Sequence, residues 1–395
     1  MGDHMSLVYG DSRLPPGIRS RVVSNGNGLA MHILEAGFEG KARPCVLLLH
    51  GFPELAYSWR KVMQPLADAG YYVVAPDQRG YGRTTGWDGT YDGDVAPFGI
   101  LNLVRDAIGL VSALGYRSVA CVVGHDFGSP VAAWCLVVRP DVFRSVVLMS
   151  APFAGPPALP FNTANEQPEI GAPTTSSIHD ELAKLQRPRK HYQQYYATRE
   201  ADANMRTAPQ GIHNFLRAYY HVKSADWKPN QPFSLESGSA AELAKLPTYY
   251  IMDLDKGMAE TVAPAMPSVA EITACSWLTE RELQVYSGEF GRVGFQGALQ
   301  WYRCAIDPIY MLRLQTYSSR IIDVPSCFIA GASDWGIYQA PGSFEKMQTS
   351  ACAQMLGVHL VGGAGHWVQQ EQPEKTSTLM LDFLAQVKTC DTTLR

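Results

Sequence analysis

A short apolar run ends in a turn that carries a carboxylate between two glycines, within residues 122–130. The order of apolar run, Gly124, Asp126 and Gly128 predicts a strand that turns sharply into a helix, because glycine lets the two elements approach closely. Such a turn holds the side chain at its apex exposed at the end of a sheet. Asp126 is anionic at neutral pH, so it could displace a leaving group at a saturated carbon without help from a base. We therefore predict a nucleophilic aspartate that cleaves a C–O or C–halogen bond, with a helix N-cap as its alternative role.

Two later loops carry the partners that such a nucleophile needs. Asp334 follows an apolar run at residues 325–330, and His366 follows another at residues 354–361. Loops at the carboxyl ends of parallel strands meet at one edge of a sheet, so Asp126, Asp334 and His366 are expected to lie together. Taken alone, such an Asp is a common turn residue and such a His a common structural one. Their order along the chain, nucleophile, acid and histidine, is that of the α/β-hydrolase fold.

A further loop, at residues 50–54, follows the apolar run at residues 46–49. In this fold the corresponding loop supplies one of two backbone donors for a developing negative charge, and the residue after the nucleophile supplies the other. We therefore expect the backbone N–H groups of Phe52 and Phe127 to form the oxyanion hole.

Alternating strand and helix patterns surround these loops. Strands are predicted at residues 19–24, 29–36, 46–49, 72–75, 118–123, 145–149, 325–330 and 354–361, and helices at 59–69, 101–114, 131–138 and 378–387. Between residues 151 and 320 the pattern changes to Pro- and Gly-rich loops, aromatic residues and helical pieces. This predicts an α/β-hydrolase fold, a mostly parallel sheet with helices on both faces and an inserted helical lid. The predicted division is a first core part at residues 6–152, the lid at 153–320 and a second core part at 321–395.

The bulk composition excludes several classes of partner. The 395 residues are 46% hydrophobic and carry a net charge of -4, which favours a full core and gives no electrostatic case for nucleic acid or an anionic membrane. No apolar run reaches the length of a membrane span, and no signal peptide follows the first five residues, which look like a cloning remnant. The eight cysteines form no CxxC pair, so reduced thiols in a cytoplasmic protein are expected.

Over nearly its whole length the chain resembles the soluble epoxide hydrolase family. The motifs that carry the resemblance are His50-Gly51-Phe52-Pro53-Glu54 with Tyr57-Ser58-Trp59-Arg60, Arg79-Gly80-Tyr81-Gly82, Gly124-His125-Asp126-Phe127-Gly128, Gly297-Ala298-Leu299-Gln300-Trp301-Tyr302-Arg303 and Gly365-His366-Trp367. In that family the aspartate of the turn is the nucleophile, matched here by Asp126. The later acid and histidine, matched by Asp334 and His366, form a charge pair.

The same resemblance implies two tyrosine acids in the lid that bind the epoxide oxygen. Tyr302 matches the tyrosine of the Trp-Tyr-Arg motif, and Tyr192 matches the second, with Tyr195 and Tyr196 as neighbours that leave this second assignment open. Phenols suit this task because the opened ring is an alkoxide, a strong base that needs a proton donor. The residues expected to bind the substrate are Phe52, Tyr192, Trp301, Tyr302, Trp335 and Trp367.

The expected reaction converts an epoxide and water to a vicinal diol through an ester on Asp126, with water activated by His366. It requires no metal and no organic cofactor. The expected substrate is a small apolar or aromatic epoxide, and the protein could be a monomer or a homodimer. A haloalkane or haloacid dehalogenase with the same nucleophile is the alternative, although Phe127 stands where a tryptophan donor to halide would be expected. A third alternative is a non-catalytic ligand receptor on this scaffold.

Overall fold

The computed structural model describes residues 9, 14–40, 42–159 and 177–393, and an eight-stranded sheet forms its centre. The strands are β1 (Ile18–Ser24), β2 (Ala30–Ala36), β3 (Cys45–Leu49), β4 (Tyr72–Pro76), β5 (Cys121–His125), β6 (Val146–Met149), β9 (Ile322–Gly331) and β10 (Cys352–Val361). They lie in the order β1-β2-β4-β3-β5-β6-β9-β10. The β1–β2 and β2–β4 pairs are antiparallel and the other neighbours are parallel, which confirms the predicted mostly parallel sheet.

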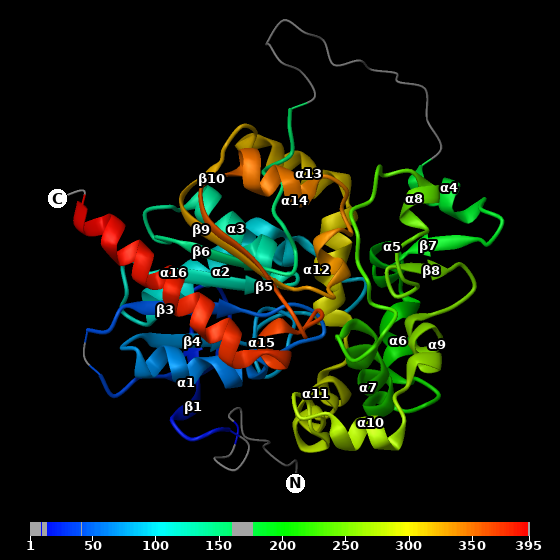
Figure 1. Cartoon of the computed structure of the whole chain (residues 1–395), viewed down its shortest axis with the longest axis horizontal. Coiled ribbons are helices and arrows are strands. Elements are labelled where there is room, and N and C mark those ends of the chain that lie inside the picture. Colours follow the sequence, from blue (N-terminus) through cyan, green and yellow to red (C-terminus); the bar gives the residue numbers. More distant parts are fainter. Residues whose placement is uncertain (1–8, 10–13, 41, 160–176, 394–395) are drawn as a thin grey trace, which may run out of the picture.

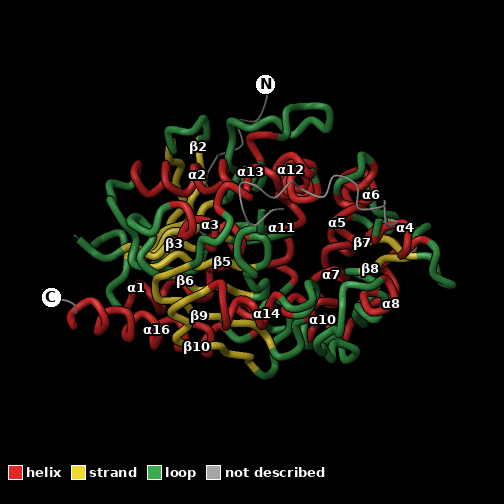
Figure 2. The backbone as a smooth tube through the Cα atoms, turned by 90° about the horizontal axis from the view of Figure 1, so that it is seen from above, coloured by secondary structure: helices red, strands yellow, loops and turns green. Residues whose placement is uncertain are grey.

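Helices cover both faces of this sheet. Helices α1 (Arg60–Asp68) and α16 (Pro373–Thr393) lie against each other on one face, and α2 (Ile100–Ala113) and α3 (Gly128–Val138) on the other (Figure 1). Figure 2 shows the same three layers from above, with the strands between the two helix pairs. Every residue of β3, β4, β5 and β6 is buried, as expected for apolar strands covered on both faces.

Helices predominate between β6 and β9. The elements of this segment are α4 (Ile178–Ala183), β7 (Arg189–His191), α5 (Tyr192–Tyr196), α6 (Glu200–Arg206), α7 (Ile212–Lys223), α8 (Ala240–Leu243), β8 (Ile251–Asp253), α9 (Met258–Val262), α10 (Val269–Ala274), α11 (Glu280–Val293), α12 (Gln296–Ile306) and α13 (Pro308–Leu314). Figure 1 shows α4 to α11 grouped beside one end of the sheet. The division at residues 152/153 and 320/321 stays a prediction, and the expected cloning remnant lies outside the described residues.

Two short strands in the lid are absent from the predicted elements. Strands β7 and β8 pair antiparallel through three residues each, from Arg189 opposite Asp253 to His191 opposite Ile251. A strand of three residues is too short to show an alternating pattern, so its sequence resembles that of a loop.

The boundaries around the sharp turn differ from the prediction in a way that matters for the site. Strand β5 begins later than expected and continues through His125, because its residues pair with β3 on one side and β6 on the other. Helix α3 begins at Gly128 rather than at residue 131. The turn between the two elements is therefore reduced to Asp126 and Phe127.

The structure bears on two expectations from the sequence, that the cysteines are unpaired and that no segment spans a membrane. The seven cysteines whose side chains are described are all free. Across the described ranges, no helix combines the length and the apolar character needed to cross a membrane.

Candidate active site

Asp126 sits at the apex of the turn in a backbone conformation that non-glycine residues seldom adopt, with a φ of 52°. The turn is tight because strand and helix touch: a Cβ on Gly124 would lie 2.0 Å from the carbonyl oxygen of Gly128. The side chain of Asp126 does not cap α3, which has no side-chain cap at its N-terminus. The N-cap alternative is therefore wrong, and the carboxylate is turned toward other partners.

The two carboxylate oxygens of Asp126 face different groups. Oδ1 accepts a hydrogen bond of 2.9 Å from the backbone N–H of Phe52. Oδ2 lies 3.2 Å from Nε2 of His366, close enough for an ion pair although the direction is not that of a hydrogen bond. Among the described hydrogen bonds, none joins the N–H of Phe127 to Asp126, although Phe127 begins the turn into α3. One of the two expected oxyanion donors is thus already engaged with the carboxylate.

His366 is held by the third predicted residue. Its Nδ1 lies 3.0 Å from Oδ1 of Asp334 and 2.9 Å from the hydroxyl of Ser150. Asp334 also accepts a hydrogen bond of 2.7 Å from the N–H of Gly336. Burial opposes ionisation of Asp334, but His366 and these donors lower its pKa, so it remains an acceptor. A neutral His366 therefore carries its proton on Nδ1 and presents the lone pair of Nε2 toward Asp126.

A buried ion pair lies behind Asp126, and this contact was not predicted from the sequence. Nδ1 of His125 lies 2.6 Å from Oε2 of Glu54, and both side chains are fully buried. Burial opposes the charge on His125, yet Glu54 and Asp126 raise its pKa to about 9. His125 also donates through Nε2 to the carbonyl oxygen of His366 at 2.7 Å. Both residues lie in the motifs quoted above, but their spacing of 71 positions gives no local sign of the contact.

The charges around Asp126 keep it ionised. Burial by itself raises the pKa of the carboxyl, whereas His366, Lys223 and His125 lower it, and the second effect prevails. The pKa of Asp126 therefore lies below its ordinary value. A permanently ionised carboxylate is the state required for attack on a saturated carbon.

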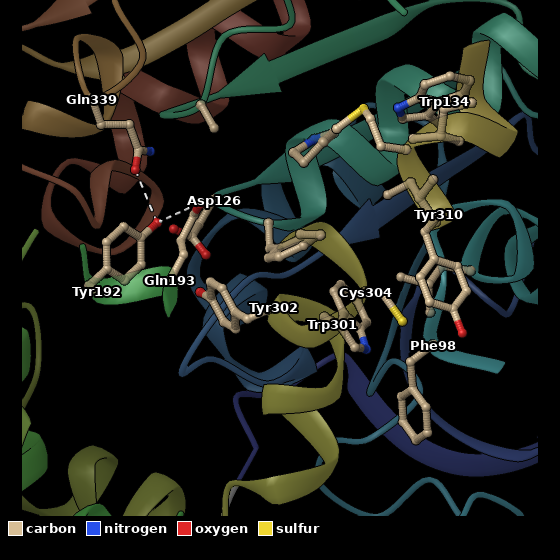
Figure 3. Close-up of a pocket in the computed structure, with 18 residues that line it drawn as sticks. Phe98, Asp126, Trp134, Tyr192, Gln193, Trp301, Tyr302, Cys304, Tyr310 and Gln339 are labelled. Carbon is tan, nitrogen blue, oxygen red and sulfur yellow. Dashed lines mark hydrogen bonds between the residues drawn. The ribbon is translucent and has the colours of Figure 1, made fainter. Parts of the chain in front are cut away.

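The opposite wall of the site comes from the lid. Tyr192 at the start of α5 and Tyr302 on α12 both line the cavity that contains Asp126 (Figure 3). The hydroxyl of Tyr192 donates to Oε1 of Gln339 at 3.0 Å and accepts from Nε2 of Gln193 at 3.3 Å. The hydroxyl of Tyr302 makes no hydrogen bond to any described residue. Burial and the charge of Asp126 raise the pKa of both phenols well above 10, so both stay protonated.

The cavity has a volume of about 260 Å³ and is polar at one end only. Asp126, Tyr192, Gln193, Tyr302 and Gln339 gather at that end. The rest of the wall is mainly apolar or aromatic and comes from the turn before α2, the start of α2, the residues after β6, and α3, α12 and α13. Its described residues are Phe98, Ile100, Leu103, Phe127, Pro130, Trp134, Ala151, Trp301, Cys304, Ala305, Tyr310, Met311 and Leu314. Figure 3 shows Trp134, Tyr310 and Phe98 on the far side from Tyr192. We call this part the apolar arm.

Three aromatic residues expected to bind the substrate are not among the described residues that line the cavity: Phe52, Trp335 and Trp367. The ring of Phe52 is buried against Tyr302, with the ring centres 5.6 Å apart. Trp367 packs edge-on against the ring of His366 at 4.6 Å, and Trp335 is buried. These three residues lie in or next to the loops that form the site, but their side chains are buried around the cavity and are not part of its described wall.

The structure also distinguishes the three tyrosines of α5. Tyr195 donates to Asn204 at 2.7 Å, and Tyr196 donates to the hydroxyl of Tyr219 at 3.1 Å. Neither is among the described residues of the cavity wall, whereas Tyr192 is. The three tyrosines stand at positions i, i+3 and i+4, which share one face of a helix, so spacing alone does not tell them apart. The packing of α5 decides which hydroxyl reaches the site.

Comparison with known proteins agrees with this geometry. Residues 44–373 match the sequence model of the family described as alpha/beta hydrolase fold, so the chain is an α/β hydrolase. It is 34% identical over 368 residues to epoxide hydrolase B of Mycobacterium tuberculosis. The aligned region covers 92% of this chain and 97% of that protein. Among solved structures, an epoxide hydrolase from an endophytic Streptomyces is 29% identical with a TM-score of 0.75, covering 95% of this chain and 97% of that one. Potato (Solanum tuberosum) epoxide hydrolase I is also 29% identical, with a TM-score of 0.68 over 93% and 99%. The chain belongs to the epoxide hydrolase family.

Proposed function

We propose that the protein hydrolyses an epoxide to a vicinal diol through a covalent ester on Asp126. The observation that carries this proposal is the shared cavity: an ionised carboxylate lies within 3.2 Å of a histidine base and faces two protonated phenols. Acyl-transfer enzymes of this fold need a hydroxyl or thiol nucleophile, which the apex of the turn lacks. Membership of the family supports the same conclusion.

In the first step Oδ2 of Asp126 attacks one carbon of the epoxide, and the C–O bond to that carbon breaks. The electron pair of the broken bond stays on the ring oxygen. That oxygen receives one proton from Tyr302 or Tyr192, which becomes a phenolate, while the other phenol donates a hydrogen bond to it. The product is a hydroxyalkyl ester. His366 takes no part in this step, because Asp126 is already ionised.

In the second step Nε2 of His366 removes a proton from water, and the resulting hydroxide attacks the carbonyl carbon of the ester. Oδ1 of Asp126, which accepts from the N–H of Phe52, becomes the oxyanion. Phe127 follows directly at the N-terminus of α3 and is proposed as the second donor. Collapse of this intermediate breaks the ester bond, and the diol leaves with the proton held by His366. The proton left on the Asp126 carboxyl returns to the phenolate formed in the first step, which restores both the carboxylate and the phenol.

The dehalogenase alternative needs N–H donors aimed at a halide in the cavity. The indole N–H of Trp301 donates to the carbonyl oxygen of Arg79, and that of Trp367 to the carbonyl oxygen of Tyr220. Trp335 makes no such bond among the described residues, but it does not line the cavity. The groups that do face Asp126 from the lid are phenols, which favours an oxygen leaving group over a halide.

The shape of the cavity supports an apolar or aromatic substituent on the epoxide. The polar groups at one end of the cavity suit the three-membered epoxide ring. The apolar arm can bury a hydrocarbon or aryl substituent, which stabilises the complex by about 25 cal/mol for each Å² of apolar surface removed from water. An epoxide with a charged substituent would leave that charge unpaired in the arm, at a cost of several kcal/mol.

The test is to interrupt the second step. In a His366→Gln variant the ester should form and persist, and intact-mass measurement after addition of styrene oxide should show the protein increased by the mass of one substrate. A His359→Gln variant is the matched control, since His359 lies on β10 outside the described cavity wall. Diol formation by His366→Gln without any adduct would exclude this mechanism. Chloride release from a chloroalkane, with no turnover of epoxides, would favour the dehalogenase.

A further inference from the structure

The loop that carries His366 is joined to the lid as well as to the sheet. The backbone N–H of His366 donates to the carbonyl oxygen of Lys223, the last residue of α7, at 2.9 Å. The indole N–H of Trp367 donates to the carbonyl oxygen of Tyr220, one turn earlier. The contact is close, because a Cβ on Gly365 would lie 2.5 Å from the carbonyl carbon of Ser224. We call this contact between the end of α7 and residues 365–367 the joint.

The side chain of Glu371 accepts hydrogen bonds from three further backbone N–H groups at the joint. Oε2 of Glu371 accepts from the N–H of Gly365 at 2.9 Å and from that of Ala225 at 2.8 Å. Oε1 accepts from the N–H of Trp367 at 2.9 Å. Glu371 therefore binds the backbone on both sides of His366 and, through Ala225, the lid segment that follows α7.

The helix that carries Glu371 is itself anchored to the core. In α15 (Val368–Glu371), Gln369 donates to Oε1 of Glu54 at 2.9 Å, and Gln370 accepts from Arg60 at 2.8 Å. Glu54 is the partner of His125, which donates to the carbonyl oxygen of His366. The backbone N–H and the backbone carbonyl of His366 are therefore each hydrogen-bonded to a residue outside the described cavity wall, Lys223 and His125 respectively.

We propose that Glu371 is a positioning residue for His366, and that it acts on hydrolysis of the ester rather than on opening of the epoxide. This inference rests on the two-step reaction proposed above. Glu371 is not among the described residues of the cavity wall, so it acts through the backbone on either side of the base. Asp126 attacks without a base, so a shift of His366 leaves the first step intact. The second step depends on placement of Nε2 between water and the ester, where an error of about 1 Å can cost a hundredfold in rate.

The experiment measures the two steps separately for the whole enzyme. Rapid mixing with styrene oxide, acid quenching and intact-mass measurement give the rates of ester formation and ester loss. In Glu371→Ala we expect ester loss to slow about ten- to a hundredfold, with ester formation within about twofold of the parent, so that the ester accumulates. Glu371→Gln keeps one acceptor oxygen and should lie between the two. Glu374→Gln, at an exposed position on α16, is the matched control.

The outcomes separate this inference from the function on which it rests. If the parent forms and loses the ester while Glu371→Ala loses it at the parental rate, Glu371 has no positioning role. Equal slowing of both steps also overturns the inference, since that is the effect of a smaller folded fraction. If Glu371→Ala does not fold, Glu371→Gln decides by the same criterion. If the parent forms no ester at all, the proposed function fails and the role of Glu371 fails with it.

Discussion

The two walls of the active site are held in different ways. On the sheet side, Asp126, Asp334 and His366 are buried and each is linked to a named partner: the Phe52 N–H, the Gly336 N–H and the Lys223 carbonyl. On the lid side, the hydroxyl of Tyr302 makes no hydrogen bond to a described residue. The hydroxyl of Tyr192 is bound, within the described part of the chain, to two glutamine side chains. The sheet wall is a hydrogen-bonded network, whereas the lid wall is a set of packed rings.

The difference follows from what each wall must do. A buried carboxylate and its base lose hydration, so partners must replace water and hold them within tenths of an ångström. A phenol that protonates a developing alkoxide needs its hydroxyl available at that moment, and a strong permanent partner would compete with the substrate. Under the proposed mechanism, we therefore expect the less engaged phenol, Tyr302, to donate the proton.

Removal of the Asp126 carboxylate should give the largest effect on the rate of any change to either wall. We expect Asp126→Ala to reduce diol formation by about ten-thousandfold or more, because no other carboxylate of the described cavity wall can take its place. The fold should persist, since the change also removes a buried charge. Initial rates of diol formation from styrene oxide, with circular dichroism as the check on folding, measure this. Activity within tenfold of the parent would mean that Asp126 is not the nucleophile.

Removal of the lid phenols should give the next largest effect on the rate. Tyr302→Phe and Tyr192→Phe should each slow ester formation about ten- to a hundredfold, with Tyr302→Phe the slower because Tyr192 is partly committed to Gln339. The double variant should slow ester formation by about the product of the two single-variant factors. Single-turnover ester formation is the measurement.

Tyr195→Phe is the control for the lid phenols, because its hydroxyl is bound to Asn204 away from the cavity. It should stay within about twofold of the parent. A loss as large as that of Tyr192→Phe would contradict the assignment of Tyr192.

The buried pair behind Asp126 should have the smallest effect on the rate, and its effect should be seen in stability instead. The pKa of His125 rises from an ordinary value of about 6.5 to about 9 in the folded protein. Its contribution to the free energy of unfolding is therefore full below pH 6.5 and is lost as the pH rises through 9, by up to about 3 kcal/mol. Urea unfolding at pH 6.5 and 9.5 should show this loss, and His125→Gln should remove the difference. An equal pH dependence in the variant would show that other groups cause it.

Much of the fold could be predicted because parallel strands leave local signs. The runs that became β3, β4 and β6 are continuous and apolar, since both faces of the sheet are covered there. The edge strand β10 is half-buried or exposed over most of its length and carries Gln354 and His359, so the fully buried strand expected there is wrong. The end of β5 was less certain from sequence, because Gly124 and His125 belong to the strand only through pairing with Leu49 and Met149. The three-residue strands of the lid are too short to show a pattern at all.

The sequence by itself determined which residues stand at the ends of the strands, and hence that a carboxylate, an acid and a histidine would meet at one edge of a sheet. That inference needs only local patterns and the rule that parallel strands end together. The folded structure was needed to show which tyrosine of α5 faces Asp126 and that the ring of Phe52 packs outside the described cavity wall. It was also needed to show that Glu54 binds His125 and that Glu371 binds the His366 loop. Those contacts join residues far apart in the chain, and side-chain direction across such distances is set by packing rather than by neighbours in sequence.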